Sequence, residues 1–244
     1  MQIRKIAAAL LLLVTLPVAG LKAQSLNDVL KAHFDAVGQN KVAKLENMTT
    51  IGKLNQSGLD IPFKQIVARP GKLRVEGTFQ GLTFIQVFNG TEGWAVNPFA
   101  GSTEPQPIPA DQLDDLKIQA DMDGMLWDYA KKGSTVTLEG TEDVEGTPCF
   151  KIRIVTADSS VFDEYIDTDS YMLIKSHSKT QMMGVDVETD TYFSNYMQKD
   201  GIAMPGRIEN RYNGVTGEVI TIESVEFDLE YQDALFDKPA AKQE

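Results

Sequence analysis

The chain has 244 residues, with 35 acidic against 23 basic side chains and a formal net charge of −12. This length suits one substantial domain or two small ones, and the excess of acid argues against a nucleic-acid partner, because phosphate binding depends on clustered Lys and Arg. The single Cys excludes an internal disulfide framework and any metal site built from several cysteines.

Residues 1–23 are typical of a secretory signal peptide. Arg4 and Lys5 precede an uncharged apolar run over residues 6–19, which is shorter than the ~20 residues that a membrane-spanning helix needs. Cleavage after Ala23 would release residues 24–244, and an uncleaved membrane anchor is the less favoured alternative. No Cys stands at the cleavage point to carry a lipid. We therefore expect a soluble periplasmic protein.

The released chain begins with a predicted amphipathic helix. Ser25 and Asp28 are spaced as in a variant of the capping box, and apolar residues then recur with the helical period as far as Gly38. His33 falls within this apolar stripe, where a hydrogen-bonded structural histidine is favoured over a catalytic one.

Two runs of β-strands are predicted between residues 48 and 229, with a helical insertion between them. The turn signals that bound the strands are close together, and loops this short favour antiparallel hairpins. The strand 82–88 carries apolar side chains on both faces, so we expect both of its faces to be covered. The predicted strands are 49–54, 61–68, 72–79, 82–88, 93–97, 136–140, 148–156, 160–167, 171–179, 185–196, 206–212 and 218–229.

The insertion covers about residues 98–133. A proline-rich loop over 98–109 leads into a stretch from Ala110 to Lys132 that is predicted to be helical, and Gly124 is placed to divide it into two short helices. An apolar face containing Met suits irregular ligands, although plain core packing is the commoner role of such a face. The apolar residues gathered here include Met122, Met125, Leu126 and Trp127.

No pattern in the sequence predicts catalysis, a metal site or a cofactor. His177 is expected to be a solvated strand residue, and Cys149 has no basic neighbour that would activate its thiol. The acidic stretches 121–124 and 163–169 resemble fragments of calcium loops but lack the full 12-residue spacing. Carboxylates alone remain as catalytic groups, so we expect a protein that is not an enzyme and needs no cofactor.

Several short motifs occur in an informative order. Ala68-Arg-Pro-Gly-Lys-Leu-Arg-Val-Glu76 precedes Phe88-Asn-Gly-Thr-Glu-Gly-Trp94 and Asn97-Pro-Phe99, and Tyr165-Ile-Asp-Thr-Asp169 and Phe236-Asp-Lys-Pro239 come late in the chain. In this order the motifs resemble those of the periplasmic outer-membrane lipoprotein carriers, LolA, and of the wider group of lipoprotein-sorting proteins. The resemblance extends over nearly all of residues 24–244.

The resemblance implies a mainly β, single-domain fold. Its sheet would be a curved antiparallel half-barrel of about 11–12 strands, closed by an N-terminal helix and by the insertion as a helical lid over an apolar cavity. Arg69 matches the family's Arg-Pro motif, whose Arg holds the lid closed; the alternative is an ordinary strand-end Arg paired with a surface acid. The residues expected to line the cavity are Leu73, Phe84, Phe88, Trp94, Met122, Met125, Leu126 and Trp127.

The function that we expect is a periplasmic carrier or chaperone, monomeric, that binds the acyl chains of lipoproteins for sorting to the outer membrane. By analogy with the family, its partners would be an inner-membrane release complex and an outer-membrane acceptor. The alternatives are an envelope-sensing or binding module for another hydrophobic ligand on the same fold and, with least support, a secreted hydrolase.

Overall fold

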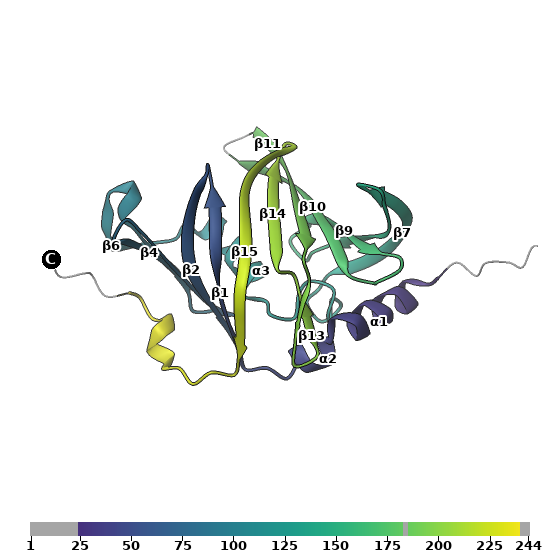
Figure 1. Ribbon diagram of the computed structural model, residues 1–244, viewed down its shortest axis with the longest axis horizontal. Coiled ribbons are helices and arrows are strands. Elements are labelled where there is room, and N and C mark those ends of the chain that lie inside the picture. The colour runs from purple at the N-terminus through teal and green to yellow at the C-terminus, as the bar shows by residue number, and fades with distance from the viewer. Residues whose placement is uncertain (1–23, 183–184, 240–244) are drawn as a thin grey trace, which may run out of the picture.

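The computed structural model describes residues 24–182 and 185–239 (Figure 1). The predicted signal peptide lies outside the described residues. Among the helices of the described ranges, none combines the length and the apolar character needed to cross a membrane.

Most of the described chain is β-strand. The strands of the main sheet are β1 (Asn47–Gln56), β2 (Leu59–Ala68), β3 (Lys72–Phe79), β4 (Leu82–Phe88), β5 (Gly93–Asn97), β6 (Ser102–Pro107), β7 (Thr135–Val144), β8 (Thr147–Val155), β9 (Val161–Asp167), β10 (Leu173–Met182), β11 (Val185–Ser194), β14 (Arg207–Tyr212) and β15 (Val215–Phe227). Two short strands, β12 (Met197–Lys199) and β13 (Ile202–Met204), form a separate hairpin.

The main sheet is open, curved and antiparallel. In the described residues it contains 13 strands in the order β6-β5-β4-β3-β2-β1-β15-β14-β11-β10-β9-β8-β7. The two predicted runs of strands join where the last strand, β15, pairs with the first, β1, from Met48 opposite Phe227 to Gln56 opposite Glu218. The predicted mainly β half-barrel is therefore confirmed, with a sheet slightly wider than expected.

The α-helices gather on one face of the sheet, which we call the inner face. They are α1 (Leu26–Val37), α2 (Gln39–Val42) and α3 (Leu113–Ala120). The chain also has 3-10 turns, of which η1 (Pro98–Ala100) and η2 (Ala110–Gln112) belong to the insertion and η3 (Asp233–Phe236) lies on the opposite face. Figure 1 shows α3 behind the central strands β1 and β15. The Ser25 side chain caps α1 in a complete capping box with Asp28, as the sequence predicts.

Separate clusters of buried side chains fix the elements that cover the inner face. Val29 and Leu30 of α1 pack on Ile152 and Ile154 of β8. Leu116 of α3 packs on strands β2 to β4. The β12–β13 hairpin packs on α2 through a cluster of Val42, Leu45 and Ile202, with Met48 and Phe227 against it.

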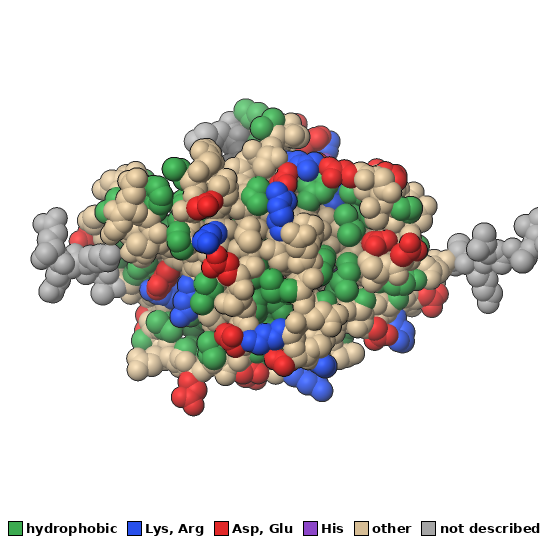
Figure 2. All heavy atoms as spheres, in the orientation of Figure 1, with side chains coloured by type: hydrophobic (Ala, Val, Ile, Leu, Met, Phe, Trp, Pro, Cys, Tyr) green, Lys and Arg blue, Asp and Glu red, His purple; other side chains and the backbone are tan. Residues whose placement is uncertain are grey.

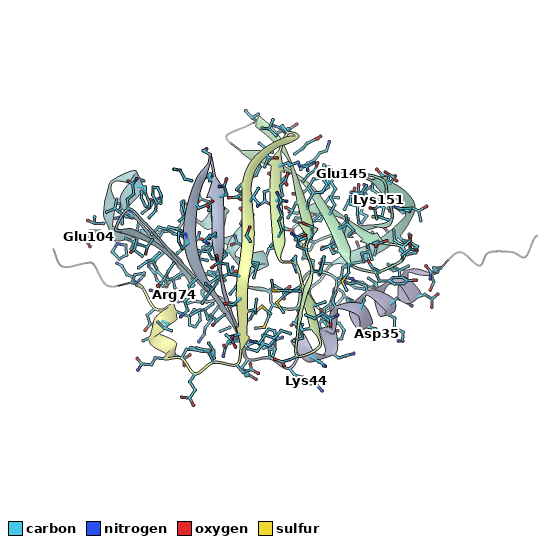
Figure 3. All side chains as sticks on the ribbon, viewed as in Figure 1. Asp35, Lys44, Arg74, Glu104, Glu145 and Lys151 are labelled. Carbon is cyan, nitrogen blue, oxygen red and sulfur yellow. The ribbon has the colours of Figure 1, made fainter. Side chains whose placement is uncertain are left out.

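The opposite face, which we call the outer face, is covered only in part. Phe236 of η3 is 1% exposed and packs on Ile66, Ala68 and Val87. Arg74 donates a hydrogen bond from Nη1 to the Leu235 carbonyl, and it lies beside the C-terminal segment in Figure 3. Elsewhere on the face seen in Figure 2, Lys and Arg side chains are interspersed with Asp and Glu.

Two parts of the chain differ from the sequence prediction. The proline-rich loop contains an edge strand, β6, which tolerates Pro105 and Pro107 because an edge strand need not donate to a neighbour on both sides. The helix expected over 110–132 ends at Ala120, and residues 121–133 form turns instead. Gly124 has a φ of 73° there, and Lys132 binds both Asp121 and the Gly124 carbonyl.

Replacing Gly38 with Ala is expected to destabilise the fold by about 2 kcal/mol or more, because the new Cβ meets backbone at a residue with positive φ. Gly38 ends α1 with a φ of 74°, and a Cβ there would lie 2.2 Å from the Gly201 carbonyl oxygen. Gly58→Ala is the matched control, since Gly58 has a φ of 80° and nothing within 4 Å of its added Cβ. Equal losses in urea unfolding would show that the contact with Gly201 carries no cost.

Candidate functional site

The sheet has two wings, one formed by β1 to β6 and the other by β7 to β11, β14 and β15, and the insertion crosses the inner face from the first wing to the second. Its α3 covers β2 to β4, where Leu116 and Ala120 are each 2% exposed. Its turns then reach the other wing, where Leu126 is buried beside α1 and β8, with Met125 packed against the same cluster. A single segment thus holds both ends of the half-barrel.

Arg69 ties this insertion to the sheet. Its guanidinium donates to both carboxylate oxygens of Asp123, from Nη1 at 2.7 Å and from Nη2 at 2.8 Å. The same side chain donates from Nε to the Leu45 carbonyl at 2.7 Å and from Nη2 to the Val42 carbonyl at 3.2 Å. It therefore joins the end of β2, the connection between α2 and β1, and the turns of the insertion.

Arg69 and Asp123 each stabilise the charged form of the other. Hydrogen bonds from Arg69 hold the pKa of Asp123 below its usual range, and Asp123 in turn raises the pKa of Arg69. The Asp123 side chain is 15% exposed and that of Arg69 is 30% exposed. A bidentate pair of this geometry, largely shielded from water, is stronger and more specific than an ordinary surface ion pair.

A belt of apolar side chains crosses the inner face between the two wings. Met48 of β1 packs with Met122 and α2 and therefore faces inward. Alternate residues of a strand share a face, so Gly52 and Leu54 of β1 also face inward. Direct cross-strand partners lie on the same face of a sheet. Two neighbouring rows of partners pass through these positions. The set, which we call the inner belt, consists of Phe193, Ile208, Ile220, Leu54 and Ile61 in one row and Ile222, Phe63 and Phe84 in the next.

The inner belt is apolar surface without a core to cover it. All eight of its side chains are half-buried, and none takes part in the packed clusters found in the described residues. Phe84 covers Gly77 of the neighbouring strand, since a Cβ at Gly77 would be 2.1 Å from its ring. The ring therefore continues the apolar row across a position that has no side chain of its own.

The predicted cavity residues divide into several groups. Phe84 belongs to the inner belt. Leu73 and Phe88 are on the inner face but are 0% and 1% exposed beneath α3, so they are core in this conformation. Met122 packs between α3 and the β12–β13 hairpin, and Met125 and Leu126 pack beside α1.

Trp94 and Trp127 do not belong with those groups. Trp94 pairs with Val87 and packs with η3 on the outer face, so its inclusion in an inner cavity was wrong. The preceding residue, Gly93, faces inward, since a Cβ there would meet Leu113 and Leu116, and successive residues of a strand face opposite sides. Trp127 makes an edge-on contact with Phe34, with ring centroids 5.0 Å apart. Both line a groove of about 630 Å³ between α1 and the insertion.

Apart from Phe84, the members of the inner belt were missed in the sequence because they come from distant strands. The alternation of Ile220 and Ile222 with Thr221 is a readable signal for one apolar face. The pairing of β15 with β1 and of β14 with β11 cannot be derived from that alternation.

The residues considered for nucleophilic or acid–base chemistry are buried or hydrogen-bonded in the fold. His33 is 9% exposed and donates from Nδ1 to the Tyr171 carbonyl at 2.8 Å, and burial lowers its pKa. Cys149 is fully buried, and burial raises the pKa of its thiol to about 11. His177, expected to be solvated, is half-buried with Nδ1 2.7 Å from Asp190 Oδ1.

The arrangement defines a class of protein: a curved antiparallel sheet whose inner face is partly covered by helices and partly left apolar. No family model and no curated protein matches the sequence. Solved structures do match the fold, and they show that the protein has the LolA-like fold.

Three of these structures match over almost their whole length. A LolA superfamily protein from Nitrosomonas europaea has a TM-score of 0.58 at 12% identity, covering 88% of this chain and 99% of its own. An outer membrane lipoprotein-sorting protein domain from Vibrio parahaemolyticus gives 0.56 at 9% identity, covering 86% and 97%. A DUF1329 family protein from Desulfovibrio piger gives 0.59 at 16% identity, covering 86% and 97%.

Proposed function

We propose that the protein is a periplasmic carrier that binds acyl chains, those of lipoproteins bound for the outer membrane, on its inner belt. The observation that carries the proposal is the inner belt itself, a continuous apolar surface on the face that the insertion partly covers. The periplasmic location rests on the predicted signal peptide. The lipoprotein cargo rests on the motif order described above and on the LolA-like fold.

The physical demand on such a carrier fits the site. Moving an acyl chain through water requires apolar burial worth ~0.8 kcal/mol for each CH₂ group. Eight half-buried side chains in two adjacent rows provide an elongated apolar surface for this purpose. Release requires that the cover over the bound chains can open, and the cover is the insertion.

Arg69 is the residue that we propose as the latch of this cover. It contacts the insertion through Asp123 and the sheet side through two backbone carbonyls. Opening would break the two hydrogen bonds to Asp123 and leave those to the Leu45 and Val42 carbonyls in place, so the guanidinium would stay positioned for the insertion to close again. Leu73 and Phe88, now buried beneath α3, would be uncovered by the same movement and extend the apolar surface.

The experiment begins with purification of the protein from the periplasm and mass spectrometry of its extracted lipids. We expect acylated species in the extract and, in a second assay, transfer of an acylated lipoprotein from membranes into the soluble fraction. Retention of a different hydrophobic molecule would favour a binding module for that ligand. Retention of no acylated species together with no transfer would contradict the carrier proposal.

Ile220→Asp is expected to reduce the retained acylated lipid at least tenfold, because it places a charge in the middle of the inner belt. Val219→Asp is the matched control: Val219 is the neighbouring half-buried residue of β15 and faces outward. Both variants should lose similar stability in urea unfolding. Equal lipid retention by the two variants would show that the inner belt does not bind the acyl chains.

A further inference from the structure

Within the described part of the chain, one carboxyl group on the inner face has no partner. Glu164 of β9 is 6% exposed, and no hydrogen bond or ion pair to its side chain is found among the described residues. Burial raises its pKa to about 7. A buried carboxylate without a partner is costly, so its presence calls for an explanation beyond packing.

Two other acidic side chains are buried in the described residues, and both have a cationic partner. Asp163, the preceding residue, faces outward and accepts two hydrogen bonds from Arg153 at 2.8 Å. Glu209 is bound by Arg211 and Arg207, at 2.7 and 2.8 Å. Of these three buried acids, only Glu164 has no cation from the protein.

The register of β9 fixes where Glu164 points. It lies directly opposite Ile152 on one side and Ser176 on the other, and Ile152 packs against α1 on the inner face. Nearby, the Tyr196 hydroxyl donates to the Leu173 carbonyl at 2.7 Å. The described residues contain no fully enclosed side-chain nitrogen or oxygen that lacks a partner, so the Glu164 oxygens retain a small contact with solvent.

A polar row connects Glu164 with the inner belt. Its direct cross-strand successors are Ser176, Thr191 and Asn210, and Thr191 donates from Oγ1 to Asn210 Oδ1 at 2.8 Å. Thr191 and Phe193 are two residues apart on β11, so the polar row runs beside the first row of the belt, about 7 Å away. The inner face therefore presents an apolar surface with a polar margin that ends in a buried carboxyl group.

We propose that Glu164 is the polar subsite of the acyl-chain site and binds a protonated amine on an amphipathic ligand whose chain lies on the inner belt. A carboxylate only accepts hydrogen bonds, and a cation brought by the ligand would supply what Arg153 supplies to Asp163. This inference rests on the proposed function, because it requires an apolar chain in the inner belt.

The test uses three probes of equal chain length, dodecylamine, dodecanol and laurate, titrated calorimetrically into the protein at pH 8. At this pH an alkylamine is protonated. Wild-type protein should bind dodecylamine at least roughly tenfold more tightly than dodecanol, a difference of ~1.4 kcal/mol. Glu164→Gln should abolish that preference while leaving dodecanol affinity nearly unchanged.

Glu104→Gln is the matched control, because it removes the same charge from an exposed residue on the β6 edge (Figure 3). It should keep the preference for the amine. Equal affinities of wild-type protein for amine and alcohol, or a preference that survives in Glu164→Gln, would overturn the amine subsite and leave the carrier proposal standing. Failure of all three probes to bind would overturn both proposals.

Discussion

Replacing Arg69 with Leu is expected to lower the free energy of unfolding by about 3 kcal/mol, because the change leaves the Asp123 carboxylate and the Leu45 carbonyl without their donor. The measurement is urea unfolding at pH 7. The same variant should load acylated lipid but release it without control, since the insertion would no longer be tied to the sheet. Normal lipoprotein transfer by this variant would count against the latch.

The control for Arg69 is Lys72→Leu, which removes a cation two residues beyond Pro70. Lys72 pairs at 3.0 Å with Asp233, whose side chain is 85% exposed. An ion pair with one partner in water contributes about 0–1 kcal/mol, so this variant should lose far less stability. Losses of the same size in the two variants would show that the bidentate geometry of Arg69 has no special value.

The second large effect is a gain of stability. Glu164→Gln should stabilise the protein by about 3 kcal/mol at pH 8, because the wild-type carboxyl must ionise in a buried site without a partner. Burial raises the pKa of Glu164 from its ordinary value of 4.5 to about 7 in the folded protein. The folded state thus holds this proton more tightly than the unfolded state does. The contribution of Glu164 to wild-type stability is full below its unfolded-state pKa and is lost as the pH rises through its folded-state pKa.

The pH dependence separates this effect from a general one. Urea unfolding at pH 4.5 and at pH 8 should give nearly equal stabilities of wild type and Glu164→Gln at the lower pH and a clear advantage of the variant at the higher pH. The exposed Glu104→Gln should behave like wild type at both. A constant difference between wild type and Glu164→Gln would mean that folding does not raise the pKa of Glu164.

Much of the fold follows from local patterns in the sequence. Hairpin turn signals and alternation predict most strands, because a strand with one face against the core and one toward water alternates apolar and polar residues. The structure of the insertion was harder to predict, because its helical period continues past Asp121. In the fold, Arg69 binds Asp123 and Lys132 binds Asp121, and these ion pairs hold the chain in turns. These contacts are tertiary, and they override the local preference.

The site illustrates a similar limit. Glu164 was visible as an acid on the face of β9 that Phe162 and Ile166 make apolar, but abundant acids elsewhere concealed the signal. Trp94 was expected to line the cavity but packs on the outer face, and the short strand β5 carries no pattern that tells which of its sides faces inward. The cover on the outer face comes from Phe236, far away in the chain, and no local pattern predicts that contact.

Photo-crosslinking at one residue tests most directly whether acyl chains lie on the inner belt. Benzoylphenylalanine would replace either Phe193, which belongs to the inner belt, or its neighbour Tyr192, which faces outward beside Arg211. The two positions are adjacent aromatic residues on opposite faces of β11. Irradiation in the presence of an acylated lipoprotein should give a cross-linked product from position 193 and none from position 192. Equal cross-linking from both positions, or none from 193, would contradict the account.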